Sequence, residues 1–155
     1  MSYVLDDIDK GILRLLQEDS RMSNKQLARR LHRTLSPIQV RVRRLQQEGF
    51  IKRNTVLLDR SKVGMRLIVY THIKLKEHTQ DSLLRFPAEA IKLHEVMECY
   101  HMSGDFDFLL RIVIKDMEEY NHLLKKKLSK LPDVATMESF FVLSEEKYET
   151  SYQLA

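Results

Sequence analysis

The sequence is poor in the residues that build disulfides, phosphate loops and large aromatic surfaces. It has one cysteine, Cys99, no tryptophan, three prolines and four glycines in 155 residues. A lone cysteine excludes a disulfide within the chain and is typical of a reducing compartment. No glycine-rich phosphate loop, Ser/His/Asp set or catalytic pair of carboxylates stands out. The enzyme classes that depend on these motifs are therefore not indicated.

Long apolar runs are also missing. The longest extend over only a few residues, far short of the roughly 20 that a membrane-spanning helix needs. The N-terminal stretch MSYVLDDIDK is too acidic and too polar for a signal peptide. A hydrophobic fraction of 43% with 31% charged residues is typical of a globular protein with one ordinary domain or two small ones. We expect a cytoplasmic protein that makes no contact with a membrane.

Acidic residues are nearly absent from one segment. Between Arg21 and Arg53 there are ten lysines and arginines and a single acid, Glu48. Because the whole chain has 26 basic and 22 acidic residues, the remainder carries 16 bases and 21 acids. The net charge of +4 therefore hides a segment of +9 beside a remainder of −5. Such a segment attracts polyanions.

The apolar pattern of the first 52 residues predicts three short helices, over residues 6–18, 23–31 and 34–48. Only His32 and Arg33 separate the second helix from the third, so the two must cross steeply, as in a helix-turn-helix. In the third helix, which Gly49 closes, the inward side chains are Ile38, Val42 and Leu45. The residues able to cap the three helices are Asp6 or Asp7, Ser23 and Thr34.

The stretch FIKRNTVLLD, residues 50–59, is rich in β-branched and apolar residues and predicts a strand, followed by a linker up to Gly64. We therefore divide the chain into a helix-turn-helix domain over residues 1–52, a strand and linker over 53–64, and a second domain over 65–155.

In the second domain the periodicity changes to two, which indicates strands. We predict a strand over 67–75, a helix over 79–93, a hairpin of strands over 96–103 and 106–115, a helix over 116–131 and a strand over 134–143. Pro87 should kink or divide the first of these helices. This order is that of a ferredoxin-like βαββαβ domain. The fold class is α+β, with a winged-type three-helix domain followed by the ferredoxin-like domain.

The sheet of such a domain has helices on one face only. The other face is not polar, because the pattern places there Ile68, Tyr70, Leu109, Val113, Phe140 and Val142. An open apolar face needs a partner. We therefore expect two copies to pack sheet to sheet into a homodimer that carries two helix-turn-helix units.

The outward face of the third helix suits double-stranded DNA. A rotation of about 100° per residue turns outward Ser36, Gln39, Val40, Arg43 and Gln47. Arg can bind guanine with two hydrogen bonds, Gln suits adenine, and the methyls of Val40 suit thymine. The other candidates for DNA contact, most of them suited to phosphates, are Arg29, Arg30, Arg33, Thr34, Arg41, Arg44 and Lys52. An ordinary solvated cationic face is the alternative, but the helix-turn-helix spacing favours DNA.

Several segments resemble the Lrp/AsnC family, the feast/famine transcription regulators. LDDIDKGILRLLQEDSRMSNKQLA is similar to the family's first two helices, and RVRRLQQEGFI to the end of its recognition helix. SGDFDFLL, LPDV and SFFVLSEEKY are similar to its C-terminal effector domain. The chain departs from the family at His32, where glycine is usual. His32 must therefore adopt a positive φ or alter the turn.

The resemblance implies a regulator of amino-acid-related metabolism that binds operator DNA, forms dimers and often octamers, and senses a small amino-acid effector between dimers. It implies no cofactor. The effector positions that it implies here are Tyr100, Ser103, Gly104, Asp105, Phe106, Asp107, Met117, Phe140, Phe141 and Val142. Backbone N–H groups of a tight turn can hold an α-carboxylate, and Asp105 or Asp107 can pair with an α-ammonium. A plain hairpin turn is the alternative.

Other functions remain open. Siroheme decarboxylases resemble the family in architecture but have lost DNA binding, so an enzyme of that kind is one alternative. An effector-binding module without operator specificity is another. The spacing of His94, Cys99 and His101 fits no zinc pattern, so we predict no metal site. The basic third helix and the GDFDF turn favour the regulator.

Overall fold

The computed structural model describes residues 3–154, which divide into two compact units. The helix-turn-helix unit takes the chain up to Leu57 and again from Lys147, and the sheet unit runs over Leu58–Glu146. Residues from Lys147 onward, which were expected in the second domain, therefore belong to the first unit. The reason is a pair of hydrogen bonds with the main chain of Tyr152. The Gln17 Nε2 donates to the Tyr152 carbonyl (3.1 Å), and the Tyr152 N–H donates to Gln17 Oε1 (2.7 Å).

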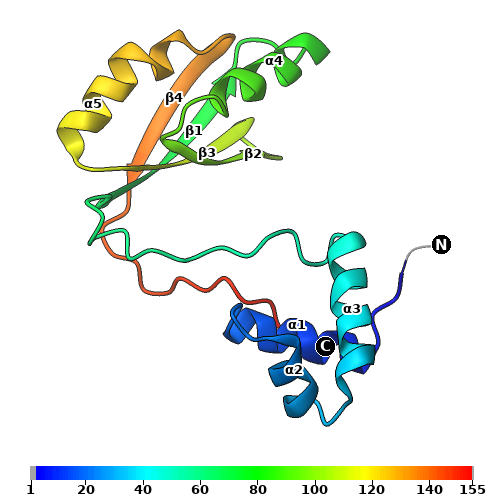
Figure 1. Cartoon of the computed structure of the whole chain (residues 1–155). Coiled ribbons are helices and arrows are strands. Elements are labelled where there is room, and N and C mark those ends of the chain that lie inside the picture. The colour runs from blue at the N-terminus through cyan, green and yellow to red at the C-terminus, as the bar shows by residue number, and fades with distance from the viewer. Residues whose placement is uncertain (1–2, 155) are drawn as a thin grey trace. The chain divides into compact units, whose positions relative to one another are not determined.

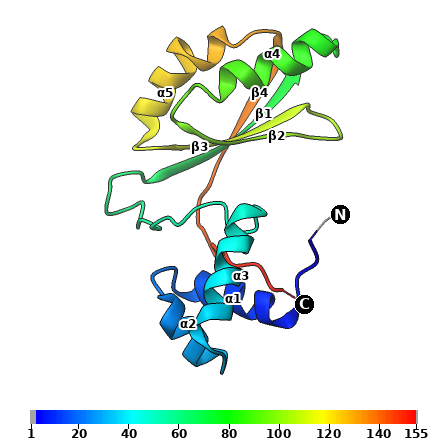
Figure 2. The ribbon, with the colours of Figure 1, turned by 45° about the vertical axis from the view of Figure 1, so that its right-hand side comes forward.

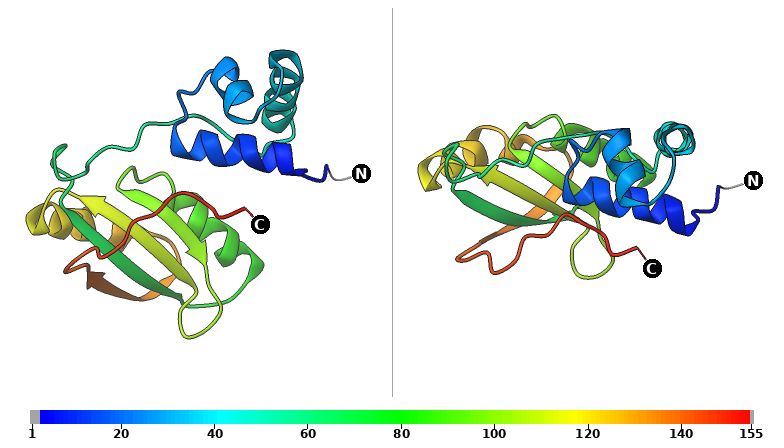
Figure 3. Two further views of the ribbon diagram at one scale, coloured as in Figure 1. Left: turned by 90° about the horizontal axis from the view of Figure 1, so that it is seen from below. Right: turned by 60° about the horizontal axis from the view of Figure 1, so that its bottom comes forward.

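Three helices form the first unit: α1 (Asp7–Glu18), α2 (Asn24–Arg30) and α3 (Leu35–Gln47). Figure 3 shows α2 and α3 against the same side of α1. Their fully or nearly fully buried apolar residues are Ile12, Leu27, Ala28, Ile38 and Leu45, with Val42 partly buried against them. This core confirms the predicted inward face of α3.

Local hydrogen bonds explain where α1 and α2 begin, whereas Thr34 precedes α3 without the capping hydrogen bond expected of its side chain. The Asp6 carboxylate accepts the Asp9 N–H, and Asp9 accepts the Asp6 N–H in return. Ser23 and Gln26 make the same reciprocal capping at the start of α2. The turn between α2 and α3 is closed by His32 at φ 52°, the first of the two outcomes expected for a residue other than glycine there.

The predicted strand over residues 50–59 is wrong. No residue in this range belongs to a strand, and the Val56, Leu57 and Leu58 side chains are all more than half exposed. A strand exists only where a neighbour pairs with its main chain. The described part of this chain supplies no such neighbour, so an extended but unpaired connection remains.

The sheet unit contains, in chain order, β1 (Leu67–Leu75), α4 (Gln80–Ala90), β2 (Val96–His101), β3 (Phe108–Ile114), α5 (Met117–Lys126), a 3₁₀ turn (Leu128–Lys130) and β4 (Val134–Phe141). The four strands are antiparallel in the order β2-β3-β1-β4. Both α4 and α5 lie on one face of the sheet (Figures 1 and 2). The predicted βαββαβ fold is confirmed.

The helices of this unit are shorter than predicted. Pro87 does not divide α4: it lies in the last turn, and the helix ends three residues later. Pro87 has no N–H to donate to the Leu83 carbonyl, and the helix ends within one turn of it. The predicted helix over 116–131 ends at Lys126, and a 3₁₀ turn follows over Leu128–Lys130.

The core of the sheet unit lies between the sheet and the two helices. Alternate residues of β1 and β3 fill it, among them Val69, Ile73 and Leu110, with no exposed surface, and Phe86 of α4 packs against Phe108. Thr71 is buried as well, and its hydroxyl shares a hydrogen bond of 3.4 Å with Tyr120 of α5. The period of two in the sequence therefore located this core.

The open face of the sheet combines apolar and charged side chains, whereas an apolar face was predicted. Phe140 is half exposed, while Tyr70, Leu109, Val113 and Val142 are partly buried and Ile68 is buried. Arg111 lies between Leu109 and Val113 on β3, and its Nη1 is 3.3 Å from Glu98 Oε1 on β2. Within residues 3–154, we find no helix with the length and apolarity to cross a membrane.

Candidate nucleic-acid interface

The outward face of α3 is exposed. Ser36, Gln39, Val40, Arg43 and Gln47 all lie in solvent, and Val40 is 63% exposed although it is apolar. The same helix buries Ile38 and Leu45 completely on its other side. The five residues predicted to meet base edges therefore share one accessible surface, which carries no acidic side chain.

A hollow extends this surface toward the start of α2. Its walls include Gln39, Val40 and Arg43 from α3, Ser20 and Ser23 from the turn between α1 and α2, and Asn24 at the start of α2. The sequence analysis did not select these last three residues. The capping role of Ser23 was a usable signal, because it placed the beginning of α2, with its free N–H groups, beside α3.

Four of the predicted phosphate contacts are exposed cations, namely Arg29, Arg30, Arg33 and Lys52. Thr34, also exposed, precedes the first turn of α3. None of the four cations pairs with an acid in the described part of the chain. Their guanidinium and ammonium groups are therefore exposed to solvent, and their contact with phosphates stays a prediction.

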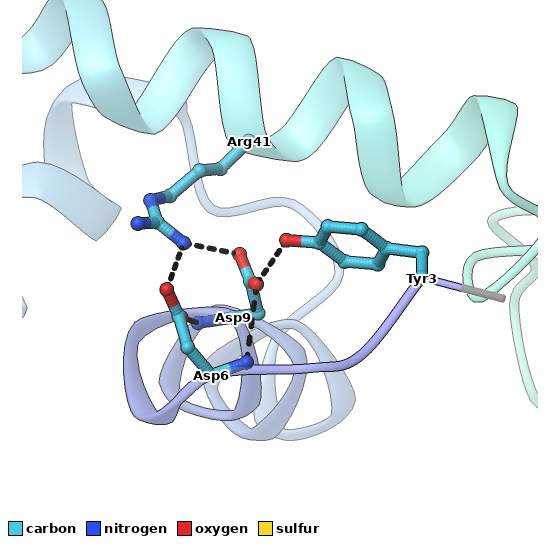
Figure 4. A network of polar contacts seen from close by, with 4 residues as sticks. All are labelled: Tyr3, Asp6, Asp9 and Arg41. Carbon is cyan, nitrogen blue, oxygen red and sulfur yellow. Dashed lines mark hydrogen bonds and ion pairs between the residues drawn. The ribbon is translucent and has the colours of Figure 1, made fainter. Parts of the chain in front are cut away.

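Arg41 lies elsewhere, and the prediction that it is free to reach a phosphate is wrong in this structure. Its Nη1 is 2.7 Å from Asp6 Oδ2 and 2.8 Å from Asp9 Oδ1, as Figure 4 shows. Only 22% of its side chain is exposed, and that of Asp9 is completely buried. Its hydrogen bonds to Asp9 first and then to Asp6 raise the pKa of Arg41 above its ordinary value.

Arg44 is also turned toward the unit's own interior. Its guanidinium lies over the Tyr3 ring, 4.4 Å from the centroid, and its Nε is buried with no hydrogen-bond partner among the described residues. Tyr3 in turn donates its hydroxyl to Asp9 and packs edge-on against Phe50. Arg44 is therefore less accessible to DNA than the four exposed cations.

The second candidate site is the turn between β2 and β3, which projects beyond the end of the sheet (Figure 3). Ser103, Gly104 and Asp105 are exposed at its tip, and Gly104 has φ 125°, a conformation that other residues rarely adopt. Phe106 stacks on His72 at 3.8 Å, and His72 also contacts Phe140 at 4.6 Å between ring centroids. The structure thus brings Phe106 and Phe140 together around one imidazole.

Asp107 differs from the predicted role. Its carboxylate already accepts the Leu75 N–H (2.7 Å) and lies 2.7 Å from His78 Nε2. Its own N–H donates to the Ile73 carbonyl at 2.8 Å. Asp107 therefore fastens the turn to the end of β1, which leaves Asp105 as the free carboxylate of the turn.

The ten predicted effector positions do not form a single pocket in one chain. Met117 begins α5 after the far end of β3, and Phe141 packs edge-on against Tyr120 of the same helix. Val142 pairs its N–H with the Ile68 carbonyl at that same end, while Tyr100 on β2 donates to Glu98. The set divides into a turn group and a helix-end group.

The residues weighed as metal ligands lie apart. His94 is exposed beside Glu95, and burial raises the pKa of the half-buried Cys99 thiol, so it stays protonated. Within residues 3–154, no three His, Cys, Asp or Glu side chains are placed to hold a metal ion.

The two units match known domain families. Residues 5–52 match a winged helix-turn-helix DNA-binding family, and residues 68–152 match the Lrp/AsnC ligand-binding domain. The chain belongs to the Lrp/AsnC family. It is a DNA-binding transcription regulator with an amino-acid-binding domain and not an enzyme, as predicted.

Similar proteins agree with the Lrp/AsnC assignment. The chain is 40% identical over 143 residues to the leucine-responsive regulatory protein of Salmonella typhimurium, covering 92% of this chain and 87% of that protein. Its counterpart in Escherichia coli strain K12 is 39% identical over the same coverage. A Neisseria meningitidis transcriptional regulator solved with L-Met superposes with TM-score 0.90 at 30% identity over 97% of both chains. An AsnC family regulator from Agrobacterium tumefaciens gives TM-score 0.91 at 34% identity over 96% of this chain and 97% of its own.

Proposed function

We propose that this Lrp/AsnC regulator reads the operators of amino-acid-related genes with α3, and that a small amino acid bound between dimers modulates the binding. The observation that carries the proposal is the exposed face of α3, where Gln39, Val40 and Arg43 lie opposite the buried Ile38 and Leu45. A helix presented in this way fits the major groove, which carries the full pattern of base edges.

Base contacts and phosphate contacts fall to different residues in this proposal. Gln39 and Arg43 offer hydrogen bonds to purines, and Ser36, Val40 and Gln47 complete the reading face. Arg29, Arg30, Arg33 and Lys52 bind phosphates and set the register. Because two copies act together, the binding should weaken steeply with salt.

The dimer in the proposal forms through the open face of the sheet. Phe140 is half exposed there, and Tyr70, Leu109 and Val113 form an apolar surround to the Arg111–Glu98 pair. A face of this kind suits a second copy, because apolar contacts surround a polar pair that is already satisfied. Two such dimer halves present two α3 helices to one operator, and the dimers assemble further into octamers.

The effector in the proposal is an α-amino acid held at the turn that contains Gly104. The exposed backbone of residues 103–105 can receive the carboxylate, and the free Asp105 can pair with the ammonium. Phe106 and Phe140 supply an apolar surface for the side chain. The leucine-responsive name of the relatives and the L-Met of the Neisseria structure favour an aliphatic amino acid.

A selection experiment tests the DNA function. The full chain selects binding sites from a random duplex pool, and the selected duplex is then compared with a mixed-sequence duplex by gel shift. We expect Arg43→Ala and Gln39→Ala to lose most of the preference for the selected duplex. Arg14→Ala, which removes a charge from the exposed side of α1, is the control and should keep it. A pool that yields no preferred sequence would contradict the proposal.

A thermal-shift screen tests the effector. Each of the twenty amino acids is added to the full chain, and we expect one or a few aliphatic ones to raise the melting temperature of the sheet unit. Asp105→Ala should abolish the shift, whereas Asp81→Ala, an exposed carboxylate of α4, should not. The effector part of the proposal fails if none of the twenty moves the melting temperature.

A further inference from the structure

Arg41 occupies an unusual place for a cation in a DNA-binding helix. It follows Val40 of the reading face, yet its guanidinium is directed toward α1, where one nitrogen contacts two carboxylates at 2.7 and 2.8 Å (Figure 4). The receiving Asp9 has no exposed surface, and Asp6 and Asp9 are themselves tied to each other by the helix cap. The guanidinium is thus fixed to a rigid helix start.

Close apolar packing sets which side of α3 is buried, with Ile38 and Leu45 fully enclosed. Hydrophobic attraction itself is non-directional, so a polar contact adds a constraint on rotation that burial alone does not supply. An ion pair with a buried carboxylate is directional, because leaving Asp9 without its partner would strand a charge in the interior. The Arg41 contact therefore defines the rotation that the apolar core leaves loosely specified.

The N-terminal segment reinforces the same arrangement. The Tyr3 hydroxyl donates to the second oxygen of Asp9, and its ring supports the Arg44 guanidinium one turn further along α3. Phe50, just after the helix, packs edge-on against the same Tyr3 ring. Arg41 and Arg44 thus anchor one side of α3, while the opposite side is left to Gln39, Val40 and Arg43.

We propose that Arg41 is a positioning residue for operator reading: held by Asp6 and Asp9, it sets the rotation of α3 that presents Gln39, Val40 and Arg43 to the bases. The inference rests on the proposed DNA function. It also removes Arg41 from the phosphate contacts, and leaves Arg29, Arg30, Arg33 and Lys52 as the exposed cations of each copy that bind phosphates.

Two measurements on the full chain test this assignment. The first is the slope of log affinity for a mixed-sequence duplex against log salt, which counts phosphate contacts. The second is the ratio of affinities for the selected and mixed-sequence duplexes. The variants are Arg41→Gln, Asp9→Asn and the double variant, with Arg33→Gln as the control, all measured at a temperature where calorimetry shows them folded.

We expect Arg33→Gln to reduce the magnitude of the slope by about 0.9 per copy bound and to leave the affinity ratio unchanged. Arg41→Gln should leave the slope unchanged and lower the ratio by about tenfold. Asp9→Asn should lower the ratio similarly, although it removes a negative charge and would strengthen binding on electrostatic grounds alone. The double variant leaves no unpaired buried charge, so it should recover part of the ratio and serves as the test if Arg41→Gln does not fold.

A slope for Arg41→Gln that falls as in Arg33→Gln would overturn the positioning role and restore a phosphate contact. An unchanged ratio in Asp9→Asn would overturn it as well. If the wild-type chain binds both duplexes equally well, the proposed operator reading fails, and this inference fails with it. The wild-type measurement alone identifies that outcome, without the variants.

Discussion

The two faces of α3 should respond in opposite ways to the same kind of truncation. Ile38→Ala removes three carbon atoms from a side chain with no exposed surface. At about 0.8 kcal/mol for each buried carbon, the transfer free energy alone is about 2.4 kcal/mol, and the cavity left behind brings the loss to about 3 to 4 kcal/mol. The helix-turn-helix unit is small, and a unit of about 65 residues has only about 3 to 10 kcal/mol of unfolding free energy.

Val40→Ala is the matched truncation on the outward face. Val40 is 63% exposed, so its loss should change the unfolding free energy by less than about 0.5 kcal/mol. Calorimetry of the full chain should therefore show the transition of the helix-turn-helix unit falling by more than about 12 °C in Ile38→Ala and by only a few degrees in Val40→Ala. Gel shifts with the selected duplex should show the reverse order for well-folded protein at low temperature. Equal melting temperatures for the two variants would refute the inward and outward assignment of α3.

Three further outcomes are expected. Gly104→Ala forces a side chain into φ 125° with open space around it, so calorimetry should show the sheet unit losing about 1 to 3 kcal/mol from backbone strain alone, and an unchanged transition would contradict the turn geometry. The Asp9 N–H donates to the Asp6 carboxylate and lowers the pKa of Asp6 in the folded state. Ionised Asp6 therefore stabilises the fold above its ordinary pKa. This contribution to the free energy of unfolding is lost as the pH falls below about 4. Melting temperatures from pH 7 to pH 3 should thus fall less steeply on the acid side in Asp6→Asn than in the wild type, and parallel curves would argue against the cap. Phe140→Glu on the open sheet face should give monomers by size-exclusion chromatography with light scattering. Leu84→Glu on α4, where the side chain is 65% exposed, should leave the sheet-to-sheet dimer intact, and dimers in both variants would place the interface elsewhere.

The elements with a strong apolar period were predictable, and the polar contacts were not. Ile38 and Leu45 lie seven residues apart on one stripe, so burial followed from spacing. The same spacing contained the signal for Arg41, which lies three residues after Ile38 and four before Leu45, on the inward side of the helix. Its charge led to the phosphate prediction, whereas the partner, Asp9, comes from a helix that starts more than thirty residues earlier.

Pairing across long separations explains the other differences. The strand predicted at residues 50–59 had the right composition, but composition does not supply a neighbouring strand. Asp107 looked free within its turn, and only the fold brings the Leu75 N–H and His78 to its carboxylate. The turn between β2 and β3 was located correctly in the chain, because glycine and aspartate between two alternating runs are typical of a hairpin.

The return of residues 147–154 to the helix-turn-helix unit has a consequence for synthesis on the ribosome. The three helices leave the exit tunnel first, but the segment that bonds Gln17 follows only after every strand of the sheet has been translated. A nascent or prematurely terminated polypeptide therefore lacks the last segment of its helix-turn-helix unit. Messages truncated upstream of Lys147 should yield products whose helix-turn-helix unit has a lower melting temperature than in the full chain. Incomplete chains would thus carry a less stable DNA-binding unit.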